Sequence, residues 1–132
     1  ADHGAHAVTD VTGFGLLGHL RTLARASGVS AEVVASAVPR LPGVAARIDA
    51  GEIPGGTVRN LDDVRAELDC DAEVAAADLT LLADAQTSGG LLLALPAAAA
   101  DDAVASLVAN GHDAAVVGRL TEGPAGHLAV RA

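Results

Sequence analysis

The sequence predicts an α+β domain in which helices cover a mixed β-sheet. Its 132 residues suit a single domain, and a hydrophobic share of 51% supplies enough apolar surface for one core. Helical apolar spacing and short apolar runs follow one another in the order β-α-β-α-α-α-β-α-β-β. Because three helical segments come in succession, the chain lacks the regular alternation of a doubly wound parallel sheet. We therefore expect one domain over residues 1–132.

The first two predicted elements flank a glycine-rich turn. Ala5–Val8 is small and apolar, as the end of a buried strand is. After the turn, apolar residues recur at helical spacing, and Arg21 and Arg25 lie on the opposite face. Gly28 then provides a helix C-cap. This part of the chain predicts a strand followed by an amphipathic helix.

A second strand and a short helix are expected next. Val29–Val38 mixes Val, Ala and Ser, with Pro39 ending it, and this composition favours a strand. Pro42 can open a helix that runs to Ala50, and Gly51 can close it.

Two further helices are expected in the middle of the chain. Pro54–Thr57 contains two adjacent glycines, which suit a turn before a helix or a loop whose N–H groups approach an anion. Asn60 is placed to cap a helix over Leu61–Leu68, with acidic residues in its first turn. The Ala-rich stretch Asp71–Ala83 predicts another helical segment.

The last third predicts a strand, a helix and a hairpin. Leu91–Leu95 is a continuous apolar run, which indicates a strand buried on both faces, and Pro96 begins a helix that ends at Asn110. Ala114–Leu120 and His127–Val130 are strand-like and are separated by a Gly- and Pro-containing turn. We expect them to form a closing β-hairpin.

Composition argues against nucleic acid and membranes as partners. The formal net charge is -9, with eight Arg and no Lys, and Phe14 is the only aromatic residue. Phosphate neutralisation needs a basic face, and base stacking needs aromatic rings. No apolar run reaches the roughly 18 residues of a membrane span, and the start lacks the features of a signal peptide. We therefore expect a soluble, cytoplasmic protein.

Cysteine and histidine give no metal motif. Cys70 stands alone, so it forms no internal disulfide and no zinc site. The five histidines lack the i, i+4 spacing of a helical metal site; they are His3, His6, His19, His112 and His127. Methionine is absent even at position 1, which predicts that these residues are a piece of a longer chain.

The stretch Thr9–His19, which reads TDVTGFGLLGH, is the expected active-site edge. Asp10 and Thr12 precede a helix start, where either side chain can cap free N–H groups. The three glycines also match G-x-G-x-x-G, with Glu32 at the distance of a ribose-binding acid, which favours dinucleotide binding. A carboxylate at Asp10 repels phosphate unless a divalent cation lies between them. The turn therefore has a third interpretation besides capping and dinucleotide binding, as a site for a metal ion and phosphate.

The turn resembles the motif that opens the C-terminal domain of the selenophosphate synthetase family, in the aminoimidazole ribonucleotide synthetase-like (PurM-like) superfamily. Two later stretches agree with it, namely PGGT followed by Arg59 and Asn60, and QTSGGLL over Gln86–Leu92. The three motifs keep the family's order and cover nearly the whole chain. Val8 and Ala85 depart from the usual Cys and Pro.

The resemblance implies the C-terminal domain fold of that superfamily and a kinase reaction. The family makes selenophosphate, AMP and orthophosphate from ATP, selenide and water, with Mg²⁺. It implies that Asp10 is a metal ligand and that Thr9, Thr12 and Gly13 orient it or line the phosphates. Roles for Thr87, Ser88 and His19 stay open.

The same resemblance implies what this stretch lacks. The family's catalytic Lys, its Cys or selenocysteine and its other metal aspartates belong to an N-terminal domain, so we expect no catalytic residue here. The implied partners are that N-terminal domain and a second copy in a homodimer. Two alternatives remain: a non-catalytic binding or dimerisation module, and another superfamily member that acts on a phosphorylated purine precursor or on thiamine phosphate.

Overall fold

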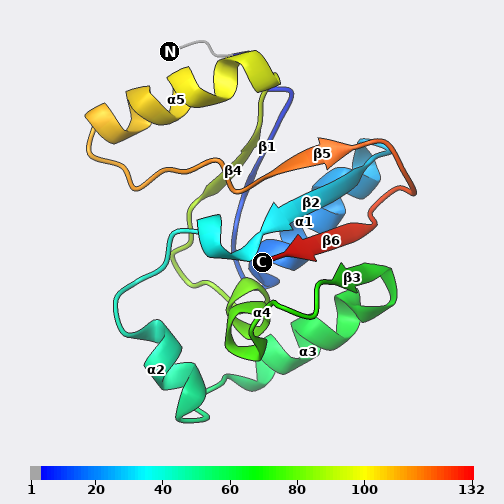
Figure 1. The fold of residues 1–132 in the computed structure, drawn as a ribbon, viewed down its shortest axis with the longest axis vertical. Helices are drawn as coiled ribbons and strands as arrows, with labels where there is room; N and C mark the ends of the chain where they lie inside the picture. The colour runs from blue at the N-terminus through cyan, green and yellow to red at the C-terminus, as the bar shows by residue number, and fades with distance from the viewer. Residues whose placement is uncertain (1–3) are drawn as a thin grey trace.

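Two β-sheets and their covering helices form the fold in a computed structural model that describes residues 4–132 (Figure 1). The elements, in chain order, are β1 (Ala7–Asp10), α1 (Gly15–Ala26), β2 (Ser30–Val34), α2 (Val44–Asp49), α3 (Gly55–Val64), β3 (Leu68–Cys70), α4 (Ala76–Leu82), β4 (Leu91–Ala94), α5 (Ala97–Ala109), β5 (Gly118–Thr121) and β6 (Leu128–Arg131). Two 3-10 turns, Ala35–Ala37 and Arg65–Glu67, follow β2 and α3.

The larger sheet has four strands in the order β3-β6-β2-β5. β6 is parallel to β2 and to β3, whereas β5 is antiparallel to β2. Alternation along β2 and β6 places Ala31, Val33, Leu128 and Val130 on one buried face. This face packs with Leu17, Leu20 and Ala24 of α1, with Val64 of α3 and with Leu82 at the end of α4, and together they form the core.

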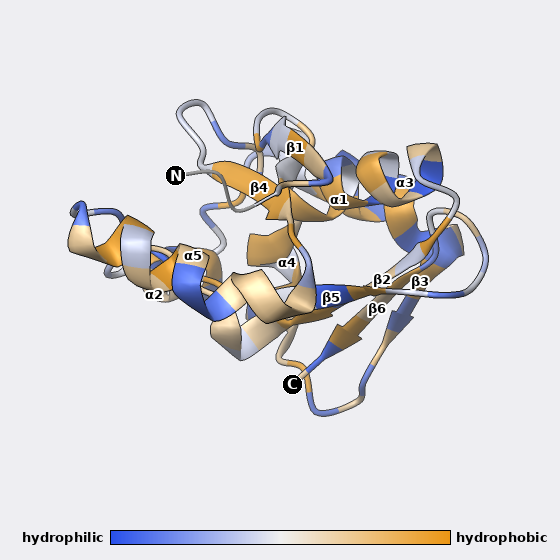
Figure 2. Ribbon diagram, turned by 90° about the horizontal axis from the view of Figure 1, so that it is seen from above, coloured by the Kyte–Doolittle hydropathy of each residue, from blue (hydrophilic) through white to orange (hydrophobic). Residues whose placement is uncertain are grey.

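Ion pairs cover the opposite face of this sheet. Glu32 of β2 lies 2.9 Å from Arg119 of β5 and 3.5 Å from Arg131 of β6. Arg131 also pairs with Asp69 and Asp71, at 3.2 and 2.8 Å. In Figure 2, hydrophobic and hydrophilic residues alternate along these strands. One face of the sheet is therefore covered by core packing, and the other face is covered by ion pairs.

The smaller sheet is a ribbon of only two antiparallel strands, β1 and β4, with Asp10 opposite Leu91 and Val8 opposite Leu93. It runs between α1 and the outlying helix α5, which lies apart from the four-stranded sheet in Figure 1. The ribbon ends at the turn that precedes α1, and so it presents the turn at an edge of the domain.

The α+β prediction is confirmed, and the helices expected after Pro42 and Pro96 are present. Gly28 follows α1 with a φ of 69°, as a C-cap glycine does. The predicted closing hairpin is wrong, because β5 and β6 do not pair with each other and instead lie on either side of β2. A β-turn sequence between two strands does not exclude a third strand from lying between them.

Three local predictions also need correction. Asn60 does not cap a helix, because α3 begins five residues earlier at Gly55 and contains Asn60. β4 is not buried on both faces, since Leu91 and Leu93 are exposed. The helix expected over 61–68 lies earlier, at Gly55–Val64, and the helix expected over 71–83 is shorter, at Ala76–Leu82. Between them β3 forms, because the parallel strand β6 offers it a partner.

Within residues 4–132, no helix combines the length and the apolar character needed to cross a membrane.

Candidate functional site

The loop that precedes β4 holds the backbone of the turn between β1 and α1. The N–H of Val11 donates to the Gly90 carbonyl at 2.9 Å, and the Thr12 carbonyl accepts from the N–H groups of Gln86 and Gly15, both at 3.0 Å. We call residues 10–15 the acidic turn and residues 83–90 the late loop. The first and third sequence motifs are thus in direct contact.

Two glycines permit this close approach. A Cβ on Gly89 would lie 1.9 Å from the Val11 carbonyl oxygen, closer than any side chain tolerates. Gly15 has a φ of 68°, and a Cβ there would lie 2.6 Å from the Ala83 carbonyl oxygen. Glycine is therefore required on both sides of the contact.

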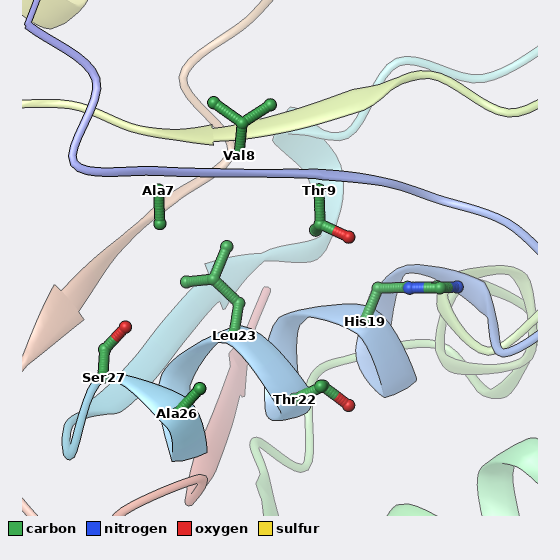
Figure 3. A pocket seen from close by; sticks show the side chains of 8 residues that line it. All are labelled: Ala7, Val8, Thr9, His19, Thr22, Leu23, Ala26 and Ser27. Atoms are coloured by element: carbon green, nitrogen blue, oxygen red, sulfur yellow. The ribbon is translucent and has the colours of Figure 1, made fainter.

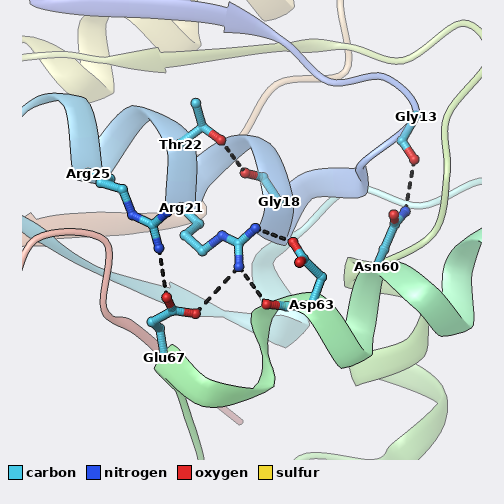
Figure 4. Close-up of polar contacts among 8 residues, drawn as sticks. All are labelled: Gly13, Gly18, Arg21, Thr22, Arg25, Asn60, Asp63 and Glu67. Carbon is cyan, nitrogen blue, oxygen red and sulfur yellow. Dashed lines mark hydrogen bonds and ion pairs between the residues drawn. The ribbon is translucent and has the colours of Figure 1, made fainter.

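Helix α3 supplies the third component. The Asn60 amide donates to the Gly13 carbonyl at 2.8 Å (Figure 4). It also donates to the Ala83 carbonyl at 3.0 Å. One turn earlier, the buried Thr57 donates through Oγ1 to Oδ1 of Asp84 at 2.5 Å. The middle motif is therefore helical and contacts both the acidic turn and the late loop through side chains. All three motifs meet at one place.

Ion pairs fix α3 against α1. Figure 4 shows Arg21 of α1 reaching both the carboxylate and the main-chain carbonyl of Asp63, and it also reaches Glu67. Arg25 lies 2.7 Å from the same Glu67. Ion pairs thus join α1 to α3 and to the 3-10 turn that follows it.

Helix capping does not explain the polar residues of the turn. The N-cap position of α1 is Phe14, and no side chain caps it, so the capping role considered for Asp10 and Thr12 is wrong. Thr12 Oγ1 instead lies 3.0 Å from Nε2 of His19, whose ring is 5.8 Å from that of Phe14. Thr12 is thereby tied to the first turns of α1, and Asp10 has no helical role.

Asp10 and Thr9 lie on opposite faces of the ribbon. Alternation places Asp10 on the same face as Val8, Leu91 and Leu93, and all four are exposed. Figure 3 shows Val8 directed away from α1 and Thr9 directed toward it. Thr9 lines a small groove of about 230 Å³ between β1 and α1, which His19 also lines. The carboxylate is therefore presented outward from an apolar surface.

The family comparison covers the whole of this arrangement. The domain described as AIR synthase related protein, C-terminal domain, matches residues 1–131. The chain belongs to this family. The resemblance seen in the three motifs is therefore confirmed at the level of the domain, and these motifs are the segments that meet at the acidic turn.

Among the relatives of this chain are several proteins that share the name "Selenide, water dikinase". The chain is 44% identical over 128 residues to "Selenide, water dikinase" of Salmonella typhimurium, covering 96% of this chain and 36% of the relative. The enzyme of the same name from Bordetella bronchiseptica is 52% identical over 92 residues, 70% of this chain and 26% of the relative. The chain thus spans about a third of the length of these relatives.

Solved structures share the fold. Hydrogenase maturation protein HypE in complex with ATP superposes with a TM-score of 0.60 at 22% identity, covering 98% of this chain and 33% of that one. Thiamine-monophosphate kinase from Stenotrophomonas maltophilia gives 0.55 at 21% identity, with 96% and 31% covered. The predicted superfamily fold is confirmed.

The topology rules out the dinucleotide-binding interpretation of G-x-G-x-x-G. In that fold the strands before and after the first helix are parallel members of one sheet. Here β1 and β2 belong to different sheets, and β1 pairs antiparallel with β4. Glu32, the expected ribose ligand, instead pairs with Arg119 and Arg131. Gly15 and Gly18 of the motif serve close packing, whereas a Cβ on Gly13 would meet nothing within 4 Å.

A divalent cation fits Asp10 as one hard oxygen ligand. None of the ion pairs formed within residues 4–132 includes Asp10. In the described part of the chain, no three His, Cys, Asp or Glu side chains cluster as a metal site. The four histidines that lie in this part form no such site, and His3 lies outside the described residues. Among the described residues, Asp10 thus offers one carboxylate outside any such cluster.

Sequence reasoning missed the contacts that hold the site together. Thr57 and Asn60 stand in the middle motif, but their bonds to Asp84, Gly13 and Ala83 join segments that are distant in the chain, and no local pattern marks those bonds. The adjacent glycines at 89 and 90 were one available signal, because glycine before a strand often marks a close backbone approach. Thr87 and Ser88 are exposed at the tip of the late loop.

Proposed function

We propose that this chain is the C-terminal domain of a two-domain selenide, water dikinase, which makes selenophosphate, AMP and orthophosphate from ATP, selenide and water. The observation that carries the proposal is the meeting of three separate motifs around the outward-facing carboxylate of Asp10. The names of the similar enzymes support it. The shared fold alone does not choose among superfamily members.

Asp10 is proposed as the metal ligand of this domain, and Thr12 and Gly13 as neighbours of the phosphates. A bound Mg²⁺ would neutralise charge that develops on the ATP phosphates. The protein's part is to hold one carboxylate at a fixed place, which the late loop, α3 and the pair of Thr12 with His19 do. Thr9 lies behind Asp10, and its Oγ1 donates to the Asp10 carbonyl at 3.0 Å.

The N-terminal domain is the proposed partner of the ribbon face that carries Asp10. This face exposes Val8, Leu91 and Leu93, although two-stranded ribbons are marginally stable in water. A domain that covers these aliphatic side chains would add further metal ligands and lower the local dielectric around Asp10. Homodimer formation and a cytoplasmic location belong to the same proposal.

The substitution Asp10→Asn in the full-length protein tests this function. It removes the charge and nearly preserves the shape, and the structure shows no capping role that it would disturb. We expect near-normal thermal melting and a loss of AMP formation of about 100-fold or more, because the charge neutralisation that a ligated cation supplies is lost. Rates are measured from ATP and selenide across a magnesium titration.

Asp113→Asn is the matched control, since Asp113 is exposed and lies far from the acidic turn in the sequence. It should leave both rate and melting unchanged. The 132-residue chain alone should show no ATP turnover, because it contains no Lys. An Asp10→Asn variant with a normal rate at low magnesium would contradict the metal assignment, and turnover by the chain alone would contradict the two-domain assignment.

A further inference from the structure

We propose that Asn60 is a positioning residue that fixes the acidic turn against the late loop and so sets the place of Asp10. The inference deepens the proposed function and rests on it for its catalytic consequence. Its structural part, a clamp between two segments 70 residues apart in the chain, stands on the hydrogen bonds alone.

Both amide protons of Asn60 are used, and each goes to a different segment. One bond reaches the Gly13 carbonyl in the acidic turn, and the other reaches the Ala83 carbonyl at the start of the late loop. Within residues 4–132, Asn60 provides the only side-chain hydrogen bond to the backbone of residues 11–14. The other hydrogen bonds to the backbone of residues 11–14 come from backbone groups.

The amide is itself held on a rigid support. α3 is anchored to α1 through the pairing of Arg21 with Asp63 and Glu67, and Val64 is buried in the core. Thr57, one helical turn before Asn60, bonds the late loop through Asp84. A group carried by an anchored helix is placed more accurately than one carried by a loop. The position of Gly13 is therefore set by α3.

Loss of this amide leaves two carbonyl groups without their donor and releases the turn three residues after Asp10. Asn60→Asp is the sharpest variant, because it keeps the shape and replaces the donating NH₂ by an acceptor that repels both carbonyl oxygens. Asn60→Ala removes the group entirely. The matched control is Asn110→Ala, which deletes another amide-to-carbonyl bond, that of Asn110 to Ser106 at the end of α5.

The test measures amide hydrogen exchange and magnesium dependence in the full-length protein. In both Asn60 variants, peptides over residues 9–19 and 83–90 should exchange about tenfold faster, the factor that corresponds to one hydrogen bond of ordinary strength. Peptides over β2 and β6 should not change. The magnesium concentration at half-maximal AMP formation should rise about fivefold or more. Asn110→Ala should change none of these.

Several outcomes would overturn the inference. Unchanged exchange in residues 9–19, or a uniform rise across all peptides, would show that Asn60 contributes only general stability, and so would a failure of both variants to fold. Faster local exchange with unchanged magnesium dependence would refute the catalytic consequence. If Asp10→Asn leaves the activity intact, the proposed function fails, but the exchange result still decides whether Asn60 clamps the turn.

Discussion

The two sheets of this domain differ in how their faces are covered. The four-stranded sheet buries one face against α1 and covers the other with ion pairs around Glu32 and Arg131. The β1–β4 ribbon packs one face toward α1 but leaves Leu91 67% exposed and Val8 54% exposed on the other. Only the larger sheet is complete within this chain.

The incomplete sheet is also the one that carries the functional candidates. Asp10 ends β1, and the late loop enters β4, so the ribbon delivers both segments to the same edge. An exposed apolar surface around a carboxylate is costly to keep unless another surface covers it. The four-stranded sheet thus carries the buried core, whereas the ribbon carries the candidate site.

A matched pair of leucines gives the largest contrast. Leu128 and Leu91 each begin a strand, but Leu128 is 0% exposed. Leu128→Ala should lower the free energy of unfolding by about 2 to 5 kcal/mol, because it leaves a cavity in the core. Leu91→Ala in the 132-residue chain should cost about 0.5 kcal/mol or less. Urea denaturation of both variants measures the difference.

The same pair in the full-length protein sharpens the contrast. If the N-terminal domain covers the ribbon, Leu91→Ala should cost more there than in the 132-residue chain, by about 1 kcal/mol or more. The cost of Leu128→Ala should not change. An equal and small cost of Leu91→Ala in both proteins would argue that this face stays in contact with water.

Adjacent glycines of the late loop provide the second contrast. Gly89→Ala would place a methyl group against the Val11 carbonyl and force the late loop away from the turn, at a cost of about 1 to 3 kcal/mol. Gly90→Ala meets open space and serves as the matched control, with an expected effect within about 0.5 kcal/mol. Thermal melting reports the cost.

The functional consequence of Gly89→Ala follows from the same contact. We expect AMP formation by the full-length protein to fall at least tenfold, since misplacement of a catalytic group by about 1 Å has effects of that size. Equal rates for the Gly89 and Gly90 variants would show that the late loop does not position the turn.

The sequence alone predicted the fold class and most elements, and the three motifs that it singled out meet at one edge of the β1–β4 ribbon. Periodicity identifies α1, because its apolar face is regular and long. It missed β3, a three-residue strand that contains a charged Asp69 and exists only because β6 is beside it. Strand partners such as β5 and β6 depend on tertiary packing, which short patterns do not encode.

For the candidate site, sequence patterns identified Asp10 but gave the wrong role to Asn60. Asp10 stands out because a carboxylate at a glycine-rich turn repels phosphate unless a divalent cation lies between them. Asn60 matched a common helix-cap pattern, and that local rule gave the wrong role, since the helix starts earlier at Gly55. Its partners Gly13 and Ala83 are 47 and 23 residues away. Contacts at such separations follow from the fold and not from spacing.

The smallest expected effect concerns Cys70, which tests how fully the edge of the four-stranded sheet is closed. Cys70 lies on the core-facing side of β3, opposite Val130, and packs against the core. Burial raises the pKa of its thiol, and the carboxylates of Asp71 and Asp69 raise it further, while Arg131 opposes them. The thiolate is therefore scarcer than in free cysteine at the same pH.

Alkylation kinetics measure this effect. Only the thiolate reacts, so iodoacetamide should modify Cys70 several-fold more slowly at pH 8 than it modifies free cysteine. Because the unfolded thiol loses its proton at a lower pH than the folded one, this group should also lower stability as the pH rises above about 8.5. Cys70→Ser lacks that contribution and serves as the control. A rate equal to that of free cysteine, with a pH midpoint near about 8.5, would mean that β3 leaves its inner side open to solvent, and the contrast between a closed sheet and an open ribbon would then be weaker than the core packing indicates.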